Sequence, residues 1–430
     1  MKKNKIFIQI ASYRDPELAH TIESLIENAD NPENLVICIA WQNNKEDKFN
    51  SEINKYFDEK RCTIKIIDID YKDSKGACWA RYEIQRRYDN EEYTLQLDSH
   101  HRFVKGWDTL TKKMYNDLIM LGIKKPLLTA YLPSYNPQND PNDRVNEPWK
   151  MVFDRFTPEG VIFFLPVTIE NWNTLLIPIR TRFYSAHFAF TTGKFCLEVP
   201  HNPEYYFHGE EISIAVRAFT HGYDLFHPHK IVAWHEYTRE GRKKHWDENK
   251  TWQSYNSNSL KINRELFGMD GLEIKDFGKF GFGKTRLLED YEKYAGIKFN
   301  NRGVQKYTLD RFDPPNPEYK NEEEYLNSFE TVFKHCINVY KDLINQNVKY
   351  DFIAIILEHE IDGETTTIFR KDLLKDEFLN IFQKQKTSNN NFYDIWVEFT
   401  TKIKPNKYVV WPYKTDEGWG DKIEGTIGEI

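Results

Sequence analysis

The sequence predicts an α/β protein with a large domain over residues 1–300, a linker over 301–321 and a small α+β domain over 322–430. Short apolar runs alternate with segments of helical periodicity in the N-terminal third of the chain. The runs end in polar residues, as strands do when a ligand binds beyond their carboxyl ends. The stretch after Gly296 is polar and contains three prolines, which is typical of a linker.

The apolar runs of the large domain have the length and composition of buried β-strands. The first run stops before Asp15 and Pro16, which suit the N-cap and the first position of a helix. Repeated strand–helix–strand units of this kind form parallel sheets. We expect strands at 6–11, 35–41, 63–69 and 93–98 and helical segments at 46–57 and 75–88.

The small domain is expected to combine a helix with a hairpin. Apolar residues from Tyr325 to Ile344 recur at helical spacing, and the segment 352–370 predicts a hairpin that turns at Asp362-Gly363. The sequence of this domain leaves its role open between acceptor recognition, contact with a partner and homo-oligomer formation.

Charge and composition exclude several classes of function. With 59 Lys and Arg against 66 Asp and Glu, the net charge of −7 gives no positive field for nucleic acid. The mean hydropathy of −0.70 and the lack of a long apolar run predict no membrane span. The N-terminal apolar run is short and interrupted by Gln9, so we expect a strand there and no signal peptide. Five cysteines without C-x-x-C spacing favour a reducing, cytoplasmic location.

The segment Gln96-Leu97-Asp98-Ser99-His100-His101-Arg102-Phe103 carries the strongest chemical signal. In an extended chain Asp98 and His100 project to one side, and Ser99 and His101 project to the other. A carboxylate and an imidazole suit a divalent ion such as Mn²⁺, with positions left open for phosphate oxygens and a third ligand from elsewhere. The alternative is a surface turn that only happens to hold these residues.

Later motifs raise the weight of the metal interpretation. Together with the D-x-H strand end, they resemble retaining glycosyltransferases of the GT-A fold, with the layout of the polypeptide N-acetylgalactosaminyltransferases. The nearer resemblance is to the cytoplasmic polypeptide (hydroxyproline) N-acetylglucosaminyltransferases and their bacterial relatives, over about residues 5–298. The motifs are IASYRDPEL, AWQNN, GACWARYE, LQLDSHHRF, HGEEISIAVR, HGYDLFHP, WHEYTR and FGFGKTRLLEDYEKYAGI.

The resemblance implies a UDP-sugar donor, with UDP-GlcNAc as the expected one, and Mn²⁺ or Mg²⁺ bound by Asp98, His100 and His235. Judged alone, His235 reads as a histidine of the core. Glu210 is implied to contact donor-sugar hydroxyls, and together with Asp98 it is the candidate catalytic residue. Its alternative role is to stabilise the positive end of a helix. A retaining mechanism requires no carboxylate base, so none is assigned.

Other residues are candidates for donor binding. The resemblance places Arg81 near the nucleotide, although a surface arginine paired with Glu83 or Asp89 would give the same pattern. The identity of the donor sugar cannot be inferred from the galactosaminyltransferases, because this sequence has His208 and Glu211 where a Gly and an Asn are common in that branch. The candidate donor-binding set is Ser12, Tyr13, Arg14, Gln42, Asn43, Arg81, Ser99, His208 and Glu211.

Several weaker patterns keep alternatives open. The segment 278–285 matches the letters of a phosphate loop, so an ATPase using Lys284 and Thr285 is one rival, and a non-catalytic nucleotide-sugar-binding protein is another. A basic run, Arg239, Arg242, Lys243, Lys244 and His245, predicts either a lid over the diphosphate or a solvated face. Aromatic candidates for an acceptor surface are Trp107, Tyr131, Tyr135 and Trp172.

Overall fold

The chain folds into two compact units in a computed structural model that describes all residues except 158, 239–241, 346–347, 386–390 and 428–430. The larger unit comprises residues 1–300 and 307–318, and the smaller unit comprises residues 301–306 and 319–430. The segment expected as a linker is divided between the units, and it contains β14 (Gly303–Gln305) and α10 (Lys306–Leu309).

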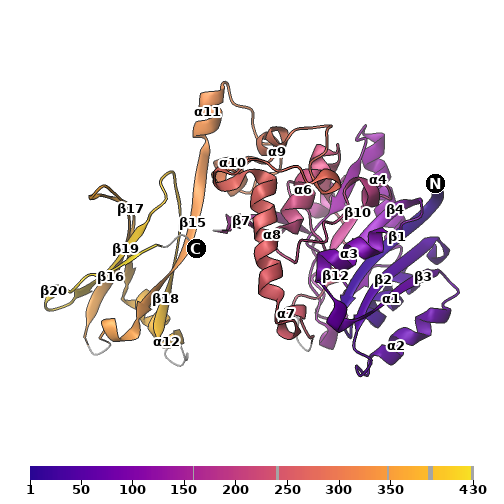
Figure 1. Cartoon of the computed structure of the whole chain (residues 1–430), viewed down its shortest axis with the longest axis horizontal. Helices are drawn as coiled ribbons and strands as arrows, with labels where there is room; N and C mark the ends of the chain where they lie inside the picture. Colours follow the sequence, from indigo (N-terminus) through magenta and orange to yellow (C-terminus); the bar gives the residue numbers. More distant parts are fainter. Residues whose placement is uncertain (158, 239–241, 346–347, 386–390, 428–430) are drawn as a thin grey trace. The chain divides into compact units, whose positions relative to one another are not determined.

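A mixed sheet with the strand order β3-β2-β1-β4-β10-β6-β11-β9 forms the centre of the larger unit (Figure 1). The predicted runs are confirmed as β1 to β4, which run parallel to one another. β10 pairs antiparallel with β4, so the sheet is mixed and not wholly parallel. The strands are β1 (Lys2–Tyr13), β2 (Leu35–Asn43), β3 (Thr63–Asp70), β4 (Glu91–Leu97), β6 (Pro126–Thr129), β9 (Ile179–Arg180), β10 (Phe188–Thr192) and β11 (Asp224–His227).

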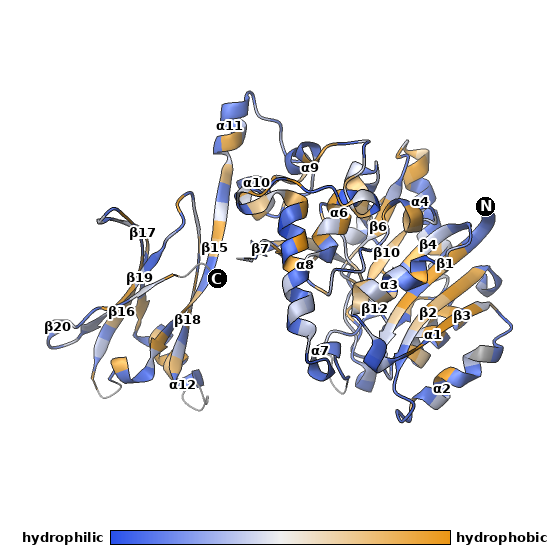
Figure 2. Ribbon diagram, in the orientation of Figure 1, coloured by the Kyte–Doolittle hydropathy of each residue, from blue (hydrophilic) through white to orange (hydrophobic). Residues whose placement is uncertain are grey.

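Helices cover both faces of this sheet because apolar residues project from both faces of its central strands. Ile6, Ile8 and Ile10 of β1 pack with α1 and α4, whereas Phe7 packs on the opposite face with α3. β2 is apolar along most of its length (Figure 2). Full burial of each such side chain contributes about 1.5–3 kcal/mol. The helices are α1 (Leu18–Glu27), α2 (Asn50–Asn54), α3 (Ala77–Gln85), α4 (Trp107–Met120), α5 (Phe195–Glu198), α6 (Glu210–Thr220), α7 (His245–Glu248), α8 (Trp252–Phe267) and α9 (Leu288–Ala295).

The first helix begins later than the sequence predicts. α1 starts at Leu18, and Asp15 instead turns the chain ahead of the helix by accepting a hydrogen bond at Oδ1 from the Glu17 N–H at 2.9 Å. The other carboxylate oxygen of Asp15 contacts Ser99 and His100. Asp15, which was expected as a helix cap, therefore also contacts the residues that follow β4.

Two strand pairs lie outside the central sheet. β5 (His101–Phe103) pairs antiparallel with β12 (Ala233–His235), with His101 opposite His235. β7 (Trp149–Phe156) and β8 (Ile162–Thr168) form an antiparallel hairpin. Both pairs lie within the larger unit, and the pairing of β5 with β12 brings a late segment of the chain to the end of β4.

The smaller unit is an α+β fold with its own apolar core. β15 pairs with β14 and β18, and β16 pairs with β17 and β19. The core joins these strands to Phe378 and Phe382 of α12. The remaining elements are α11 (Glu322–Asn327), β15 (Phe329–Tyr340), β16 (Tyr350–Ile361), β17 (Glu364–Leu374), α12 (Lys375–Gln385), β18 (Phe392–Thr401), β19 (Lys407–Lys414), β20 (Gly418–Trp419) and β21 (Ile423–Thr426).

The hairpin predicted in this unit is confirmed, but the predicted helix is wrong. Asp362 and Gly363 join β16 to β17 with φ of 52° and 84°, as a tight hairpin turn requires. Most of the apolar residues from Tyr325 onward lie in strand β15. Ile337 and Val339 alternate toward the core, and pairing with β18 satisfies the backbone. Aromatic and β-branched residues fit such a strand as well as they fit a helical spacing.

Candidate active site

A cavity of about 440 Å³ lies at the carboxyl ends of the parallel strands. Tyr13, Gln42 and Asp98, which end β1, β2 and β4 or follow them, form one part of its wall. The start of α6, residues 161–164 of the β7–β8 hairpin and the segment 242–246 form other parts of it. The cavity therefore lies where the polar strand ends of the sequence predicted a site.

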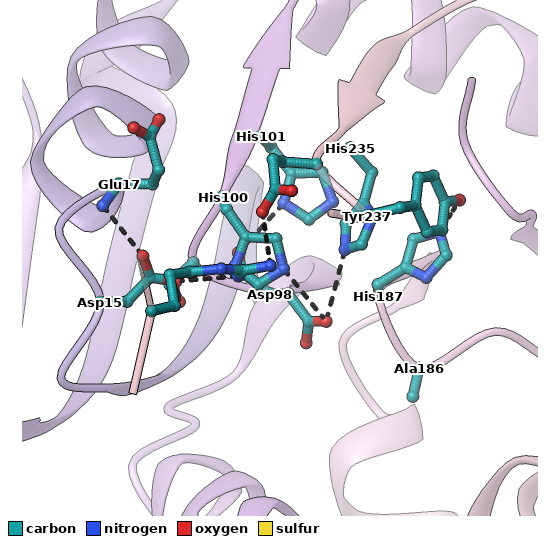
Figure 3. A network of polar contacts seen from close by, with 12 residues as sticks. Asp15, Glu17, Asp98, His100, His101, Ala186, His187, His235 and Tyr237 are labelled. Carbon is teal, nitrogen blue, oxygen red and sulfur yellow. Dashed lines mark hydrogen bonds and ion pairs between the residues drawn. The ribbon is translucent and has the colours of Figure 1, made fainter. Parts of the chain in front are cut away.

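Asp98, His100 and His235 meet in this cavity (Figure 3). One ligand atom from each lies within 4.8 Å of the others. Oδ2 of Asp98 is 3.9 Å from Nε2 of His100 and 3.6 Å from Nε2 of His235, which exceeds hydrogen-bonding distance. Antiparallel pairing of β12 with β5 positions His235, so backbone hydrogen bonds bring the third side chain to the first two.

The surroundings of the His235 ring are those expected of a metal ligand. Both of its nitrogens are buried and have no hydrogen-bond partner among the described residues. Burial lowers the pKa of His235 well below its ordinary value, which leaves a neutral ring that can offer a lone pair to a cation. One carboxylate and two imidazoles fit a divalent ion of intermediate hardness. The set of donor atoms therefore fits Mn²⁺, and the alternative of a satisfied core histidine is not what the structure shows.

Strand alternation does not continue through the end of β4. Ser99 Oγ and His100 Nδ1 both contact Oδ2 of Asp15, at 2.7 and 2.8 Å, although the sequence predicted them on opposite sides. The reason is that β4 ends at Leu97 and the chain turns before β5. Arg242 Nη1 reaches the same oxygen at 3.3 Å. Asp15 thereby orients His100 so that its Nε2 faces the site, as carboxylates do for metal-binding histidines.

Arg81 lies behind the metal-binding candidates as a buried bridge. Its Nη2 donates to Asp98 Oδ1 at 2.8 Å and its Nη1 donates to Glu210 Oε1 at 2.5 Å. Burial opposes ionisation of both acids, but Arg81 with nearby histidines lowers the pKa of Glu210 to about 2 and that of Asp98 well below its ordinary value. Glu83 pairs instead with Arg86, so the alternative of a surface arginine does not apply to Arg81.

The adjacent acids Glu210 and Glu211 differ in their surroundings. Glu210 is only 5% exposed, and its Oε2 accepts a hydrogen bond from the Cys78 thiol. Glu211 is more exposed at the cavity, where it accepts hydrogen bonds from the Ala186 N–H at 2.9 Å and from the Tyr131 hydroxyl at 3.3 Å. Burial raises the pKa of Glu211 to about 7. Glu211 is thus the acid of the cavity whose protonation state can change near neutral pH.

The candidate donor-binding residues divide into two groups. Those that line the cavity are Tyr13, Gln42, Arg81, Ser99, His208 and Glu211. The others are engaged elsewhere: the Ser12 carbonyl accepts from Gln42, Asn43 donates to Asp68 at 2.7 Å, and Arg14 pairs with Asp47 and Glu248. The roles of both groups in binding a donor remain predictions. Because the second group does not line the cavity, it favours a role in supporting the residues that do.

The basic run forms one side of the cavity. Arg242, Lys243, Lys244 and His245 line it, while Arg239 lies outside the described residues. Polar contacts fasten this segment to the strand ends: His245 Nδ1 accepts from the Tyr206 hydroxyl at 2.7 Å, its Nε2 donates to the Ser74 carbonyl at 3.1 Å, and Glu248 accepts from the Tyr13 hydroxyl at 2.9 Å. This arrangement favours a wall of the site over a freely solvated face.

The expected acceptor aromatics are mostly internal, and some site residues were missed. Tyr131 lines the cavity, but Trp107 and Tyr135 are buried packing residues and Trp172 lies on a short turn. The missed residues are His187, stacked at 4.2 Å on His235, and Tyr237, whose ring lies 4.3 Å from the ring of His235. The spacing of Tyr237 two residues after His235 could have indicated it, whereas His187 carried no signal.

The phosphate-loop interpretation of residues 278–285 lacks its structural context. Residues 272–277, which precede the motif, form no strand, and Gly278–Phe280 is a short 3₁₀ turn. Gly283 packs so closely on the end of α6 that an added Cβ would lie 2.5 Å from the Thr220 backbone. This loop therefore serves packing, and the strand–loop–helix geometry that an ATPase needs is not formed by these residues.

The strand order, with antiparallel β10 following the parallel strands, and the acid–histidine site at the end of β4 are those of an α/β domain of the GT-A fold, the class predicted from the sequence. The family model "Glycosyltransferase (GlcNAc)" matches residues 5–60 and 53–301, more than half of the chain. The chain belongs to this glycosyltransferase family. No curated protein matches it.

Similar solved structures are distant. GalNAc-T7 with UDP, GalNAc and Mn²⁺ is 14% identical over 71% of this chain and 56% of that chain, with a TM-score of 0.46. Residues 1–349 of TarS from S. aureus are 11% identical over 61% of this chain and 72% of that chain, with a TM-score of 0.35. The mannosyltransferase PcManGT from Pyrobaculum calidifontis, with GDP-Man and Mn²⁺, is 11% identical over 55% and 58%, with a TM-score of 0.35. The chain spans little more than half of the GalNAc-T7 chain.

Within the described parts of the chain, every helix is too short or too polar to cross a lipid bilayer.

Proposed function

We propose that this chain is a metal-dependent, retaining glycosyltransferase that moves N-acetylglucosamine from UDP-GlcNAc to a hydroxyl group of a protein or glycan. The observation that carries the proposal is the meeting of Asp98, His100 and His235 at the floor of the cavity. The family description supports GlcNAc as the sugar. The uridine nucleotide and the retaining course follow from the resemblance of the motifs to hydroxyproline N-acetylglucosaminyltransferases.

Asp98, His100 and His235 would hold Mn²⁺ or Mg²⁺, which as a Lewis acid neutralises charge developing on a leaving diphosphate. Asp15 and Arg81 position two of these ligands. Arg242, Lys243 and Lys244 add positive charge to the wall of the cavity, where it would attract the diphosphate. The contacts of His245 and Glu248 hold this wall in place.

Glu210 and Glu211 take different roles in this proposal. Glu210 acts as a positioning residue, because Arg81 and Cys78 occupy its two oxygens inside the protein. Glu211 and Tyr131 face the cavity as a pair that can exchange hydrogen bonds with sugar hydroxyls. We assign no enzymic base, since the leaving phosphate can accept the proton of the acceptor hydroxyl in a retaining reaction.

The test is a donor screen that measures UDP release from nucleotide sugars with and without Mn²⁺. We expect slow hydrolysis of UDP-GlcNAc that requires the metal and is lost in Asp98→Asn but kept in the exposed control Asp58→Asn. Tight, metal-independent binding of UDP-GlcNAc by the Asp98→Asn variant would contradict the proposal. Thermal protection by ATP and not by UDP, lost in Lys284→Ala, would favour the ATPase, and binding of donors without any UDP release would favour a non-catalytic protein.

A further inference from the structure

A second group of metal-ligating side chains lies behind the wall of the cavity. Cys78 of α3, His201 of the loop after α5 and Glu210 of α6 each offer one ligand atom within 4.8 Å of the others. All three residues are buried, with 0%, 1% and 5% of their surface exposed. The group shares no residue with Asp98, His100 and His235, and Glu210 connects it to the cavity.

The hydrogen bonds of His201 fix which ring nitrogen carries its proton. Gln96 Nε2 donates to the Ala186 carbonyl at 2.6 Å, so its Oε1 faces the ring and accepts from His201 Nε2 at 2.5 Å. The lone pair of the neutral ring is then on Nδ1. That nitrogen lies 3.4 Å from Oε2 of Glu210 and has no hydrogen-bond partner among the described residues.

Two acceptor atoms that face each other in the protein interior require a positive species between them. A cation satisfies both atoms, and the amide oxygen of Gln96 orients the imidazole as partners of metal-binding histidines do. The unpartnered Nδ1 therefore points to a ligand and not merely to packing.

Glu210 shares the single positive charge of Arg81 with Asp98. A divalent cation at the cluster would replace the Cys78 thiol proton, which is released to solvent, so that the sulfur binds as a thiolate. One sulfur, one imidazole nitrogen and one carboxylate oxygen are the donor atoms that Zn²⁺ prefers.

We propose that Cys78, His201 and Glu210 form a second divalent-cation site of the zinc class, separate from the site at Asp98. The cation would hold Oε2 of Glu210 while Arg81 holds Oε1 and reaches Asp98 through its other nitrogen. Occupancy of the buried site would thus fix the residues that position the first one.

Cobalt binding to the full chain tests this site independently of catalysis. The experiment uses His235→Ala, which removes one ligand of the first site and leaves the Arg81 contacts in place. We expect one equivalent of Co²⁺ to bind with the near-ultraviolet charge-transfer band of a thiolate–cobalt bond, and added Zn²⁺ to abolish the band. The band should be lost in Cys78→Ser and kept in Cys196→Ser, a buried cysteine outside the cluster.

A missing band in the His235→Ala protein, a band that survives Cys78→Ser, or equal loss in Cys196→Ser would overturn the proposal. If Cys78→Ser fails to fold, His201→Gln gives a second measurement, with an expected loss of Co²⁺ affinity of at least tenfold. Unchanged affinity in that variant would also overturn it. None of these results depends on UDP-sugar turnover, so failure here leaves the proposed function standing, and the reverse holds.

Discussion

The carboxylate of Asp15 lies 2.8 Å from Nδ1 of His100 and joins the end of the first strand to the end of the fourth. Asp15 is 5% exposed, and it also accepts hydrogen bonds from Ser99 and from the Glu17 backbone. Burial disfavours its charge, but His100 and Arg242 outweigh burial and lower its pKa. An ionised Asp15 favours the tautomer of His100 that has its proton on Nδ1, which leaves Nε2 to bind a metal.

The first prediction concerns this contact. Asp15→Asn weakens the fixed orientation of His100, so we expect Mn²⁺ affinity to fall about 10–100-fold while the fold is retained. Isothermal titration of the variant against the wild type measures the change, with the exposed Asp58→Asn as control. Equal affinities in all three proteins would show that Asp15 does not support the ligand.

The second prediction concerns Arg81. Arg81→Ala leaves Asp98 and Glu210 near each other without their shared cation, so we expect the free energy of unfolding to fall by about 3 kcal/mol or more. The matched control is Arg86→Ala, just after the same helix, where the side chain is 61% exposed and pairs with Glu83. We expect that control to change stability by less than about 1 kcal/mol. Urea unfolding distinguishes the two, and similar losses would contradict the bridge.

The third prediction uses the pH dependence of Glu211. Its pKa in the folded protein is raised from 4.5 to about 7, so its contribution to stability is complete below about pH 4.5 and is lost as pH rises through about 7. Glu211→Gln removes this ionisation and keeps the acceptor for the Ala186 N–H. We expect the free energy of unfolding of the wild type minus that of the variant to decrease by about 3 kcal/mol over that range. A difference that stays flat with pH would refute a buried, titrating Glu211.

The fourth prediction compares two glycines with positive φ. Gly76 has φ of 104°, and an added Cβ would lie 2.8 Å from the Tyr206 ring, whereas Gly122 has φ of 87° and open space around it. We expect Gly122→Ala to lower stability by about 1 kcal/mol from backbone strain alone, and Gly76→Ala to cost about 2–3 kcal/mol. Gly76→Ala should also weaken UDP-GlcNAc binding, because Tyr206 contacts His245 in the wall of the cavity. Binding by the Gly122→Ala protein should match that of the wild type.

Local patterns were sufficient to predict the parallel strands and the position of Asp98 and His100 just beyond the fourth of them. Buried strands are nearly continuous apolar runs, and the resemblance supplied His235 where spacing alone could not. The sequence did not indicate that Asp15 and His187 lie beside the site histidines, because these contacts involve other elements and not neighbours in sequence. Nor could the sequence show the different surroundings of Glu210 and Glu211, because side chains adjacent on a helix point in different directions and only the packed structure shows the partners of each.

The smaller unit shows the opposite limit of sequence interpretation. Its first long segment has apolar residues that fit helical spacing, but its β-branched and aromatic side chains also fit an alternating strand. Pairing between β15 and β18, whose sequences lie more than fifty positions apart, decides the outcome. A partner so distant along the chain leaves no trace in local periodicity.

The antiparallel register of His101 with His235 makes the proposed metal site depend on two segments that leave the ribosome at different times. A nascent chain that ends at β11 already contains Asp98 and His100 but lacks the third proposed ligand. Under the proposed function, the complete site would therefore form only after β12 has paired with β5.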